Sequence, residues 1–587
     1  MASDRITGLP DNTIDEILKY LPLKEVVRTS VLSREWRYKW LSVPHLDFSW
    51  DFQKSLPSEC PIEGVISHIL LLHKGPIVKF SLRYSNYAHV VVSRWLQILK
   101  TKCVEDFSLG VWAETTIYAI PSDLFSFHLL RHLQLNLVAI TLPTTFKGFP
   151  ELVKLTLELV EITYEELRMF ICSCPKLEWL YLHELTDVPT FWVHDVDAPK
   201  LKYLELVGNS VELAPTFNGF SLLAELRLSI VKIAPQVLQR FLSECPLLEL
   251  VYISSCYYET PLSRLDINAT NLKLSSLIQL ELANVQITPE GLESIISKCP
   301  MFERLSISSC FSPTTVWCLD IDAPNLRELV IKHTGIKLPP TFHGFSRLAS
   351  LCLAGLVIDP EELQLFISKC PVLHSLTVRK CNDQNGFWPL NIDAPNLRVL
   401  NLDGLFSSIC AQNTQSVQEV SAVYPYFALL SKDADYGRLK SSWAIGDESN
   451  MIKFFGQLPS IVKLEVGISF LQFLALGGVP RELPSKLNDL KTIELKKMNF
   501  GIMDHVNSVV CLIRSSPKLY SLVINFEGWQ TRSWGEEWSH VNESIRAEQT
   551  QKAVEYMKDI QKQNIPYNDI KIVKMKLFEG TQPEWNL

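Results

Sequence analysis

A short leucine pattern recurs along most of this 587-residue sequence and leaves few architectures open to it. The pattern is Leu-x-x-Leu-x-Leu, and neighbouring copies begin 22 to 29 residues apart. The first apolar residues of the clear copies are Leu130, Leu152, Leu177, Leu201, Leu223, Leu248, Leu277, Phe302, Leu326, Leu348, Leu373 and Leu397. The fourth and sixth positions of a strand point to one face. Because one such strand cannot bury that face alone, the copies must stack and share a continuous core.

Longer motifs repeat together with the leucine pattern. Pro-Thr-Phe-x-Gly-Phe begins at Pro215 and Pro340, and a variant of it begins at Pro143. Cys-Pro begins at Cys174, Cys245, Cys299 and Cys370, at spacings of 71, 54 and 71 residues. A large module was therefore duplicated. The short period lies within the window of about 20–29 residues that is typical of leucine-rich repeats. The sequence predicts an α/β leucine-rich-repeat solenoid, with a curved parallel sheet and short helices.

The segments between the strands carry helix start signals. Residues 162–171, 287–296 and 358–367 are each predicted to form a short helix. Thr163 with Glu166, and Asp359 with Glu362, have the spacing of a capping box, in which two residues satisfy each other's free backbone N–H groups. The helices should cover the side of the sheet opposite its free face.

Composition excludes several classes of function. The net charge of −8 and the pI of about 6.0 do not favour a nucleic-acid partner. No apolar stretch reaches the roughly 20 residues that span a bilayer, and no signal peptide is recognised, so we expect no membrane partner and a location in the cytoplasm, the nucleus or both. The cysteines lack zinc-ligand spacing, and no catalytic motif is present. We therefore expect no metal, no cofactor and no enzyme activity.

Residues 4 to about 45 lie outside the repeats and carry three predicted helices. Pro10 opens the first helix, Pro22 ends it, and Trp36 and Trp40 share one face of the third, which is expected to begin at Ser33. So small a unit with so much apolar surface is expected to need a partner. The segment closely resembles the plant F-box, which binds a Skp-type adaptor and through it a cullin. That resemblance implies adaptor contacts or F-box core positions at Leu9, Pro10, Ile14, Ile17, Leu18, Val26, Val31, Leu32, Trp36 and Trp40.

The C-terminal region returns to the repeat pattern after a lapse. Residues 487–524 resemble the FBD segment that closes many plant F-box proteins with leucine-rich repeats. Trp529, Trp534 and Trp538 are interpreted as sealing the end of the solenoid, and residues 570–577 as an edge strand. The expected domains are an F-box over 1–50, a solenoid over 75–405, an irregular insertion over 406–457, FBD-like repeats over 458–530 and a cap over 531–587.

The resemblance implies the substrate-recognition subunit of an SCF-type (Skp-cullin-F-box) ubiquitin ligase, with an unidentified protein substrate. Two alternatives stay open: a binding scaffold that acts outside ubiquitination, and a ligand-sensing receptor. Outward positions of neighbouring strands gather aromatic and charged residues, and this composition is typical of an interface centre with a polar rim. The predicted substrate-binding residues, with the aromatic ones expected to be exposed, are Trp179, Tyr181, Tyr203, Glu205, Glu225, Arg227 and Tyr252.

Overall fold

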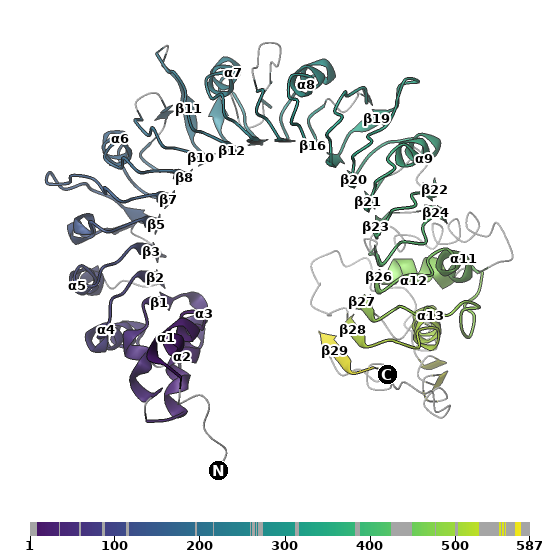
Figure 1. Cartoon of the computed structure of the whole chain (residues 1–587), viewed down its shortest axis with the longest axis horizontal. Helices are drawn as coiled ribbons and strands as arrows, with labels where there is room; N and C mark the ends of the chain where they lie inside the picture. The colour runs from purple at the N-terminus through teal and green to yellow at the C-terminus, as the bar shows by residue number, and fades with distance from the viewer. Residues whose placement is uncertain are drawn as a thin grey trace. The chain divides into compact units, whose positions relative to one another are not determined.

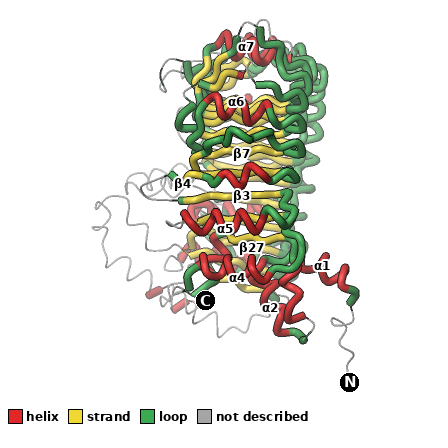
Figure 2. Tube along the Cα trace, turned by 90° about the vertical axis from the view of Figure 1, so that its left-hand side faces the viewer, coloured by secondary structure: helices red, strands yellow, loops and turns green. Residues whose placement is uncertain are grey.

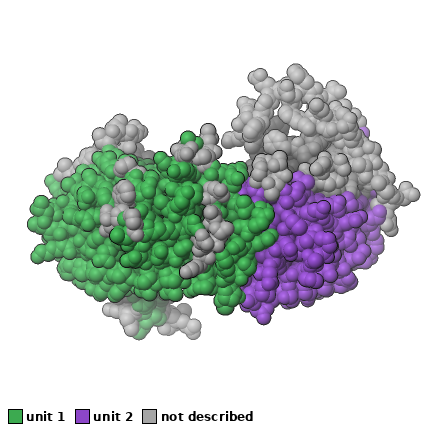
Figure 3. Space-filling view, turned by 90° about the horizontal axis from the view of Figure 1, so that it is seen from above, with its two compact units in different colours: residues 1–301 green, residues 302–587 purple. Residues whose placement is uncertain are grey.

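The computed structural model of the chain contains two compact units, residues 1–301 and 302–587 (Figure 3). The described residues are 9–576 except 35, 58–59, 85–88, 113–116, 189, 194–195, 215, 259, 261–263, 266, 268–273, 312–315, 382–387, 405, 424–448, 476, 499–502, 527–550, 553–554, 557 and 559–569. The tryptophan cluster at 529–538 and most of the expected cap lie outside the described residues.

The N-terminal unit begins with the small helical region. Its helices are α1 (Asp11–Lys19), α2 (Leu23–Arg28), η1 (Thr29–Val31) and η2 (Trp36–Ser42). The third predicted helix is a 3₁₀ helix that begins at Trp36 rather than at Ser33. Ser33 precedes it as a capping group, since the Trp36 backbone N–H donates to the Ser33 hydroxyl at 3.3 Å.

Parallel strands then line one side of the N-terminal unit, while its helices lie on the other side (Figure 1). These strands are β1 (His45–Phe48), β2 (Lys79–Tyr84), β3 (Asp106–Val111), β5 (His132–Asn136), β7 (Lys154–Glu158), β8 (Trp179–His183), β10 (Tyr203–Val207), β12 (Glu225–Ser229), β14 (Leu250–Ser254) and β15 (Gln279–Ala283). The helices after them are α3 (Trp50–Lys54), α4 (Ile62–Leu72), α5 (His89–Leu99), η3 (Ser122–Ser126), α6 (Tyr164–Cys172), α7 (Pro235–Ser243) and α8 (Pro289–Ile296). Short secondary strands are β4 (Tyr118–Ala119), β6 (Val138–Ala139), β9 (Phe191–Trp192), β11 (Ser210–Glu212) and β13 (Lys232–Ile233).

The C-terminal unit repeats this plan. Its main strands are β16 (Arg304–Ser308), β18 (Glu328–Lys332), β20 (Ser350–Ala354), β21 (Ser375–Arg379), β23 (Val399–Asp403), β25 (Glu419–Ala422), β26 (Lys463–Gly467), β27 (Thr492–Met498), β28 (Ser521–Phe526) and β29 (Ile572–Lys576). Its helices are α9 (Pro360–Ser368), α11 (Asn450–Gly456), α12 (Ile468–Ala475) and α13 (Met503–Arg514), and its secondary strands are β17 (Val316–Cys318), β19 (Gly335–Lys337), β22 (Trp388–Asp393) and β24 (Phe406–Gln412).

The leucine register is what holds the strands together. Leu155, Leu180 and Leu204 pair across β7, β8 and β10, and the three side chains are fully buried. Figure 2 shows the strands stacked in this way, each roughly parallel to the next, with helices alongside. The leucine-rich-repeat solenoid predicted from the sequence is confirmed in both units, because the same inward positions form the core of each.

Helix starts follow the predicted chemistry at one repeat and depart from it at another. At α6, Thr163 accepts from the Glu166 N–H and Glu166 accepts from the Thr163 N–H, which completes the capping box. At α9, Asp359 instead accepts from the N–H of Glu361 at 2.8 Å. Asp359 therefore satisfies a different N–H of the first turn from the one that the capping-box spacing predicts.

The repeated Pro-Thr-Phe-x-Gly-Phe and Cys-Pro motifs meet in space. Gly344 has a positive φ of 80°, and a Cβ atom there would overlap the carbonyl oxygen of Lys369, the residue before Cys370. Gly148 lies in the same way against Ser173, and Gly219 against Glu244. The two motifs repeat with the same period because the glycine of one packs against the backbone that precedes the other.

The segment 406–457 contains regular elements. β25 pairs in parallel with β23 on one side and with β26 on the other, so the sheet of the C-terminal unit continues through it. Its core residues Val417, Val420 and Ala422 replace the usual leucines. Further on, β29 pairs with the edge of β28 at the position of the expected edge strand.

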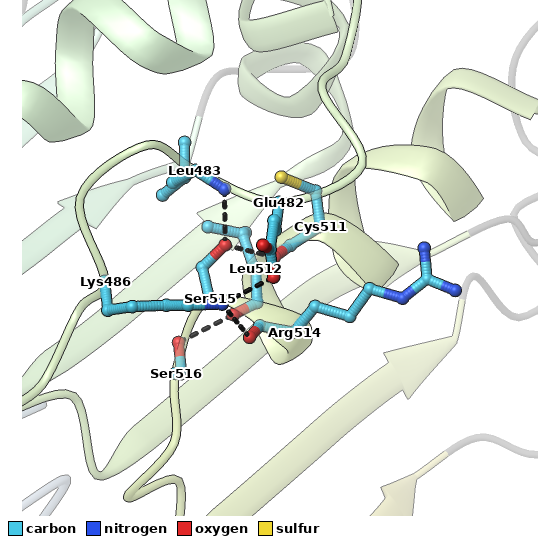
Figure 4. A network of polar contacts seen from close by, with 8 residues as sticks. All are labelled: Glu482, Leu483, Lys486, Cys511, Leu512, Arg514, Ser515 and Ser516. Carbon is cyan, nitrogen blue, oxygen red and sulfur yellow. Dashed lines mark hydrogen bonds and ion pairs between the residues drawn. The ribbon is translucent and has the colours of Figure 1, made fainter. Parts of the chain in front are cut away.

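A loop of the FBD-like region is fixed to the end of α13 by polar contacts, of which those of Ser515 are buried (Figure 4). The Ser515 hydroxyl accepts from the backbone N–H of Leu483 at 2.8 Å and donates to the carbonyl of Cys511 at 2.7 Å. The Lys486 ammonium donates to the Arg514 carbonyl at 3.3 Å. Ser515 and Lys486 therefore both connect the loop to the helix.

Candidate adaptor and substrate surfaces

The N-terminal helices close around a small apolar core. Ile14, Leu18, Val26, Trp36 and Val43 form this cluster and are each almost completely buried. Leu9 and Trp40 are partly buried and pack against it. Six of the residues expected at adaptor contacts or in the F-box core therefore hold these helices together: Leu9, Ile14, Leu18, Val26, Trp36 and Trp40.

The other four expected residues face solvent. Val31 is 85% exposed, Leu32 is 54% exposed and Ile17 is 43% exposed. Pro10, just before α1, is also exposed. A fold of this size has little reason of its own to leave such side chains uncovered, so these four are the better candidates for direct contact.

The sequence reasoning missed two exposed aromatic residues on the same small unit. Tyr20 is 86% exposed and Tyr38 is 63% exposed. Tyr20 follows directly after the last residue of α1, and Tyr38 lies in η2 between Trp36 and Trp40. The signal that could have found them is an aromatic residue placed off the helical core spacing.

The predicted substrate-binding residues come together on the free face of one sheet. Trp179 and Tyr203 are partners across β8 and β10, and Tyr203 pairs in turn with Glu225 on β12. One row further along the strands, Tyr181 pairs with Glu205, and that row continues through Arg227 to Tyr252. The structure therefore places all seven residues on neighbouring strands β8, β10, β12 and β14.

One expectation about this surface is wrong. Tyr203 is only 7% exposed, whereas Trp179, Tyr181 and Tyr252 are half-buried. The cause is direct stacking: the Trp179 and Tyr203 rings lie 3.3 Å apart between centroids, with an interplanar angle of 6°. Strands in one sheet are close enough for large flat side chains at paired positions to cover each other.

Polar contacts fix the side chains of this face. The Arg227 Nε donates to Glu225 Oε1 at 2.6 Å, and the Tyr203 hydroxyl donates to Glu205. Burial, together with the hydrogen bond to Glu205 and the charge of that carboxylate, raises the pKa of the Tyr203 phenol. The phenol therefore stays protonated as a donor, and the ring pair is held in one orientation.

A small pocket adjoins this face on the N-terminal side. Its volume is about 170 Å³, which is below the roughly 300–1,000 Å³ of ordinary ligand pockets. It is lined by Arg83, Ser108, Leu109, Gly110, Trp112, Gln134, Asn136 and Glu158. A pocket of this size fits a single side chain of a partner better than a whole small molecule.

The repeated cysteines lie in the core rather than at a reactive site. Cys174, Cys245 and Cys370 are buried free thiols, and burial raises the pKa of Cys174 to about 12. The Cys174 thiol is 3.2 Å from the Phe170 carbonyl of α6. Within the described residues, no group of three or more His, Cys, Asp or Glu side chains is arranged to hold a metal ion. No described helix combines the length and the apolar character needed to cross a membrane.

Two family models match this chain. The F-box domain matches residues 6–47, and "FBD-associated F-box protein At5g56370, LRR repeats" matches residues 92–212 and 333–524, more than half of the chain. Fold and matches together define a leucine-rich-repeat protein with an N-terminal F-box. The chain belongs to the family of FBD-associated F-box proteins with leucine-rich repeats.

Two individual relatives agree with this assignment. The F-box/FBD/LRR-repeat protein At1g13570 of Arabidopsis thaliana is 28% identical over 393 residues, which cover 64% of this chain and 91% of that protein. The F-box/LRR-repeat protein At3g26922 of the same organism is 30% identical over 235 residues, covering 35% of this chain and 75% of that protein. Among solved structures, the LRR ectodomain of the Arabidopsis thaliana receptor kinase GASSHO1/SCHENGEN3 is 15% identical at a TM-score of 0.35, covering 85% of this chain and 56% of that one.

Proposed function

We propose that this protein is the non-catalytic substrate-recognition subunit of an SCF-type ubiquitin ligase. In this proposal the F-box binds a Skp-type adaptor, and through it a cullin, while the repeats bind a protein substrate. The F-box match and the membership of a family of F-box proteins support the first half. The half-buried aromatic and charged face of β8 to β14 supports the second.

The observation that best supports adaptor binding is that the F-box has a complete core and still exposes apolar side chains. Val31 and Leu32 remain largely exposed although the cluster of Ile14, Leu18 and Trp36 is complete without them. Burying a Val or Leu side chain in an interface contributes about 1.5–3 kcal/mol. A partner that covers both residues therefore gains most of the energy of a hot spot without disturbing the fold.

The test is copurification of the full chain with a Skp-type adaptor. The double variant Val31→Asp and Leu32→Asp places two charges in the expected interface and should reduce adaptor binding by at least about a hundredfold, since even one unpaired buried charge costs several kcal/mol. The control is Leu71→Asp, because Leu71 is 74% exposed on α4 in the same unit. Retention of the adaptor by the double variant at the control level contradicts the proposal.

Leu9 and Pro10 offer a second test, with a different readout. Replacing both with alanine should abolish adaptor binding while the repeats stay folded. Because Leu9 packs against the F-box core and Pro10 only flanks α1, the single variant Pro10→Ala separates contact from local folding. Circular dichroism of each variant shows whether the repeats are intact.

The substrate half is tested by replacing Trp179 and Tyr203 together with alanine. The double variant should lose a captured substrate but keep the adaptor. Because the two rings stack, their loss also removes about 0.5–1.5 kcal/mol of ring–ring stabilisation, so the unfolding midpoint is measured in parallel. Ubiquitin transfer to the captured substrate in a reconstituted ligase separates this role from a scaffold that acts outside ubiquitination. The role implies a cytoplasmic or nuclear location, which a fluorescent fusion would report.

A further inference from the structure

Three aromatic rings of the substrate face differ in what lies over them. The Lys154 ammonium lies 4.5 Å from the centre of the Trp179 ring, and the Arg227 guanidinium lies 5.5 Å from that of Tyr252. Each of these rings already holds a cation of its own chain. In the described part of the protein, no lysine or arginine occupies the corresponding place over Tyr181.

Two carboxylates lie close to Tyr181. Glu205 is its register partner on β10. Glu158 lies on β7, the strand on the other side, where its register partner is His183, two residues beyond Tyr181. The His183 Nδ1 atom lies 3.4 Å from the Tyr181 hydroxyl. Burial raises the pKa of the Tyr181 phenol, and the negative charges of Glu158 and Glu205 raise it further. Tyr181 is half-buried, with part of the side chain open to solvent.

Neither carboxylate forms an ion pair with a lysine or arginine among the described residues, although Arg227 is the register partner of Glu205 on β12. Glu158 accepts from the side-chain amide of Asn136, and Glu205 accepts from the hydroxyl of Tyr203. Among the described residues, no lysine or arginine nitrogen lies within 4.0 Å of either carboxylate. His183 Nδ1 lies 3.5 Å from Glu158, but a histidine carries charge only when protonated. The Arg227 head is already held by Glu225 at 2.6 Å.

We propose that this face binds a lysine or arginine side chain of the protein substrate, placed over Tyr181 between Glu158 and Glu205. The inference rests on the proposed function of the repeats in substrate binding, and it adds the chemical class that they select. The occupant is a basic segment of a protein, because the charges and the ring are complementary to a cation. Arginine is the better fit of the two, since its planar head both stacks on a ring and donates to two carboxylates.

The probe is a fluorescein-labelled peptide of three arginines separated by glycines, mixed with the full-length protein and followed by fluorescence anisotropy. Peptides with glutamine or glutamate in place of arginine are the comparisons. We expect the arginine peptide to bind and the other two not to bind. The double variant Glu158→Gln and Glu205→Gln should weaken arginine-peptide binding by roughly tenfold, and so should Tyr181→Leu, while Tyr181→Phe, which keeps the ring, should bind as the wild type does.

A matched control separates this site from general attraction to an acidic protein. Glu165→Gln with Glu290→Gln removes the same charge from exposed positions on α6 and α8, and should leave peptide binding unchanged. Equal loss in both double variants, or equal binding of the glutamine peptide, overturns the proposal. Adaptor copurification is measured on the same preparations. If the wild-type protein does not bind the adaptor, the ligase role is refuted. The cation site is then tested separately by the anisotropy measurements with the three peptides.

Discussion

Replacing a glycine with alanine can cost free energy in two ways: through a left-handed backbone conformation and through overlap of the new Cβ atom with its neighbours. Three glycines of the C-terminal unit allow these two costs to be measured separately. Gly456 ends helix α11, and a Cβ atom there meets no other atom within 4 Å. Gly478 has a φ of 90°, with equally open surroundings. Gly344 combines a φ of 80° with the overlap against Lys369. The series therefore adds first the backbone conformation and then the close approach that joins two repeated motifs.

The expected free energies follow from these geometries. Gly456→Ala should be neutral or stabilise by up to about 1 kcal/mol, because alanine loses less backbone entropy in a helix. Gly478→Ala should cost about 1–2 kcal/mol, the penalty of a left-handed conformation for a residue with a Cβ atom. Gly344→Ala carries that penalty and a forced backbone shift of about 1–3 kcal/mol, so its total is roughly 2–5 kcal/mol.

Hydrogen exchange followed by mass spectrometry measures these costs where they arise. Peptides that cover α9 report the opening free energy around Gly344, and peptides that cover α11 and α12 report the other two sites. Opening near α9 should become easier by several kcal/mol in Gly344→Ala only. Equal losses in Gly344→Ala and Gly478→Ala would show that the overlap with Lys369 costs nothing, and the structural link between the two motifs would then be refuted.

Two further predictions concern the buried polar groups and thiols. Ser515→Ala should destabilise the C-terminal unit by about 1–3 kcal/mol in urea unfolding, because the Leu483 N–H loses its acceptor. The control is Ser516→Ala, which removes only a contact to Leu512 within the end of its own helix and should cost less. Equal costs of the two substitutions would contradict the argument. Burial raises the pKa of Cys174 and Cys256 from 9.0 to about 12, so the folded state keeps protons that the unfolded state loses above pH 9. The contribution of these two thiols to the free energy of unfolding is therefore complete below pH 9 and falls as the pH rises from 9 towards 12. Unfolding free energies that stay constant from pH 8 to pH 11 would argue against this effect.

The repeat strands could be predicted from the sequence because burial leaves a periodic trace. Leucines at two positions of each repeat define both the strand and its inward face. The inward positions of Leu155 and Leu180 could therefore be predicted without any knowledge of the tertiary structure. β25 was not predicted as a strand, because Val420 and Ala422 fill the same core positions with smaller side chains and so weaken the leucine pattern. The residue types changed while the geometry did not.

The candidate surfaces were harder to predict, because exposure depends on neighbours that the sequence does not place. In the F-box, Val26 and Val31 have the same chemistry, yet one is fully buried and the other is 85% exposed. On the sheet, Tyr203 occupies an outward position but is covered by Trp179 from the next strand. A one-dimensional pattern identifies the face of a strand, whereas the cover provided by adjacent strands depends on the register and the size of two side chains together.

Several glutamates on the sheet of the C-terminal unit form ion pairs within the protein. Lysine or arginine nitrogens lie within 4.0 Å of the carboxylates of Glu328, Glu419, Glu465 and Glu494. Opposite charges paired across or along strands in this way contribute about 0.2–1 kcal/mol each to a sheet. Glu158 and Glu205 have no lysine or arginine nitrogen within 4.0 Å among the described residues; neutral amide and hydroxyl groups donate to them, and His183 Nδ1 lies 3.5 Å from Glu158. These contacts orient both carboxylates without a lysine or arginine partner within 4.0 Å, which is the arrangement we expect where the cation comes from a bound protein.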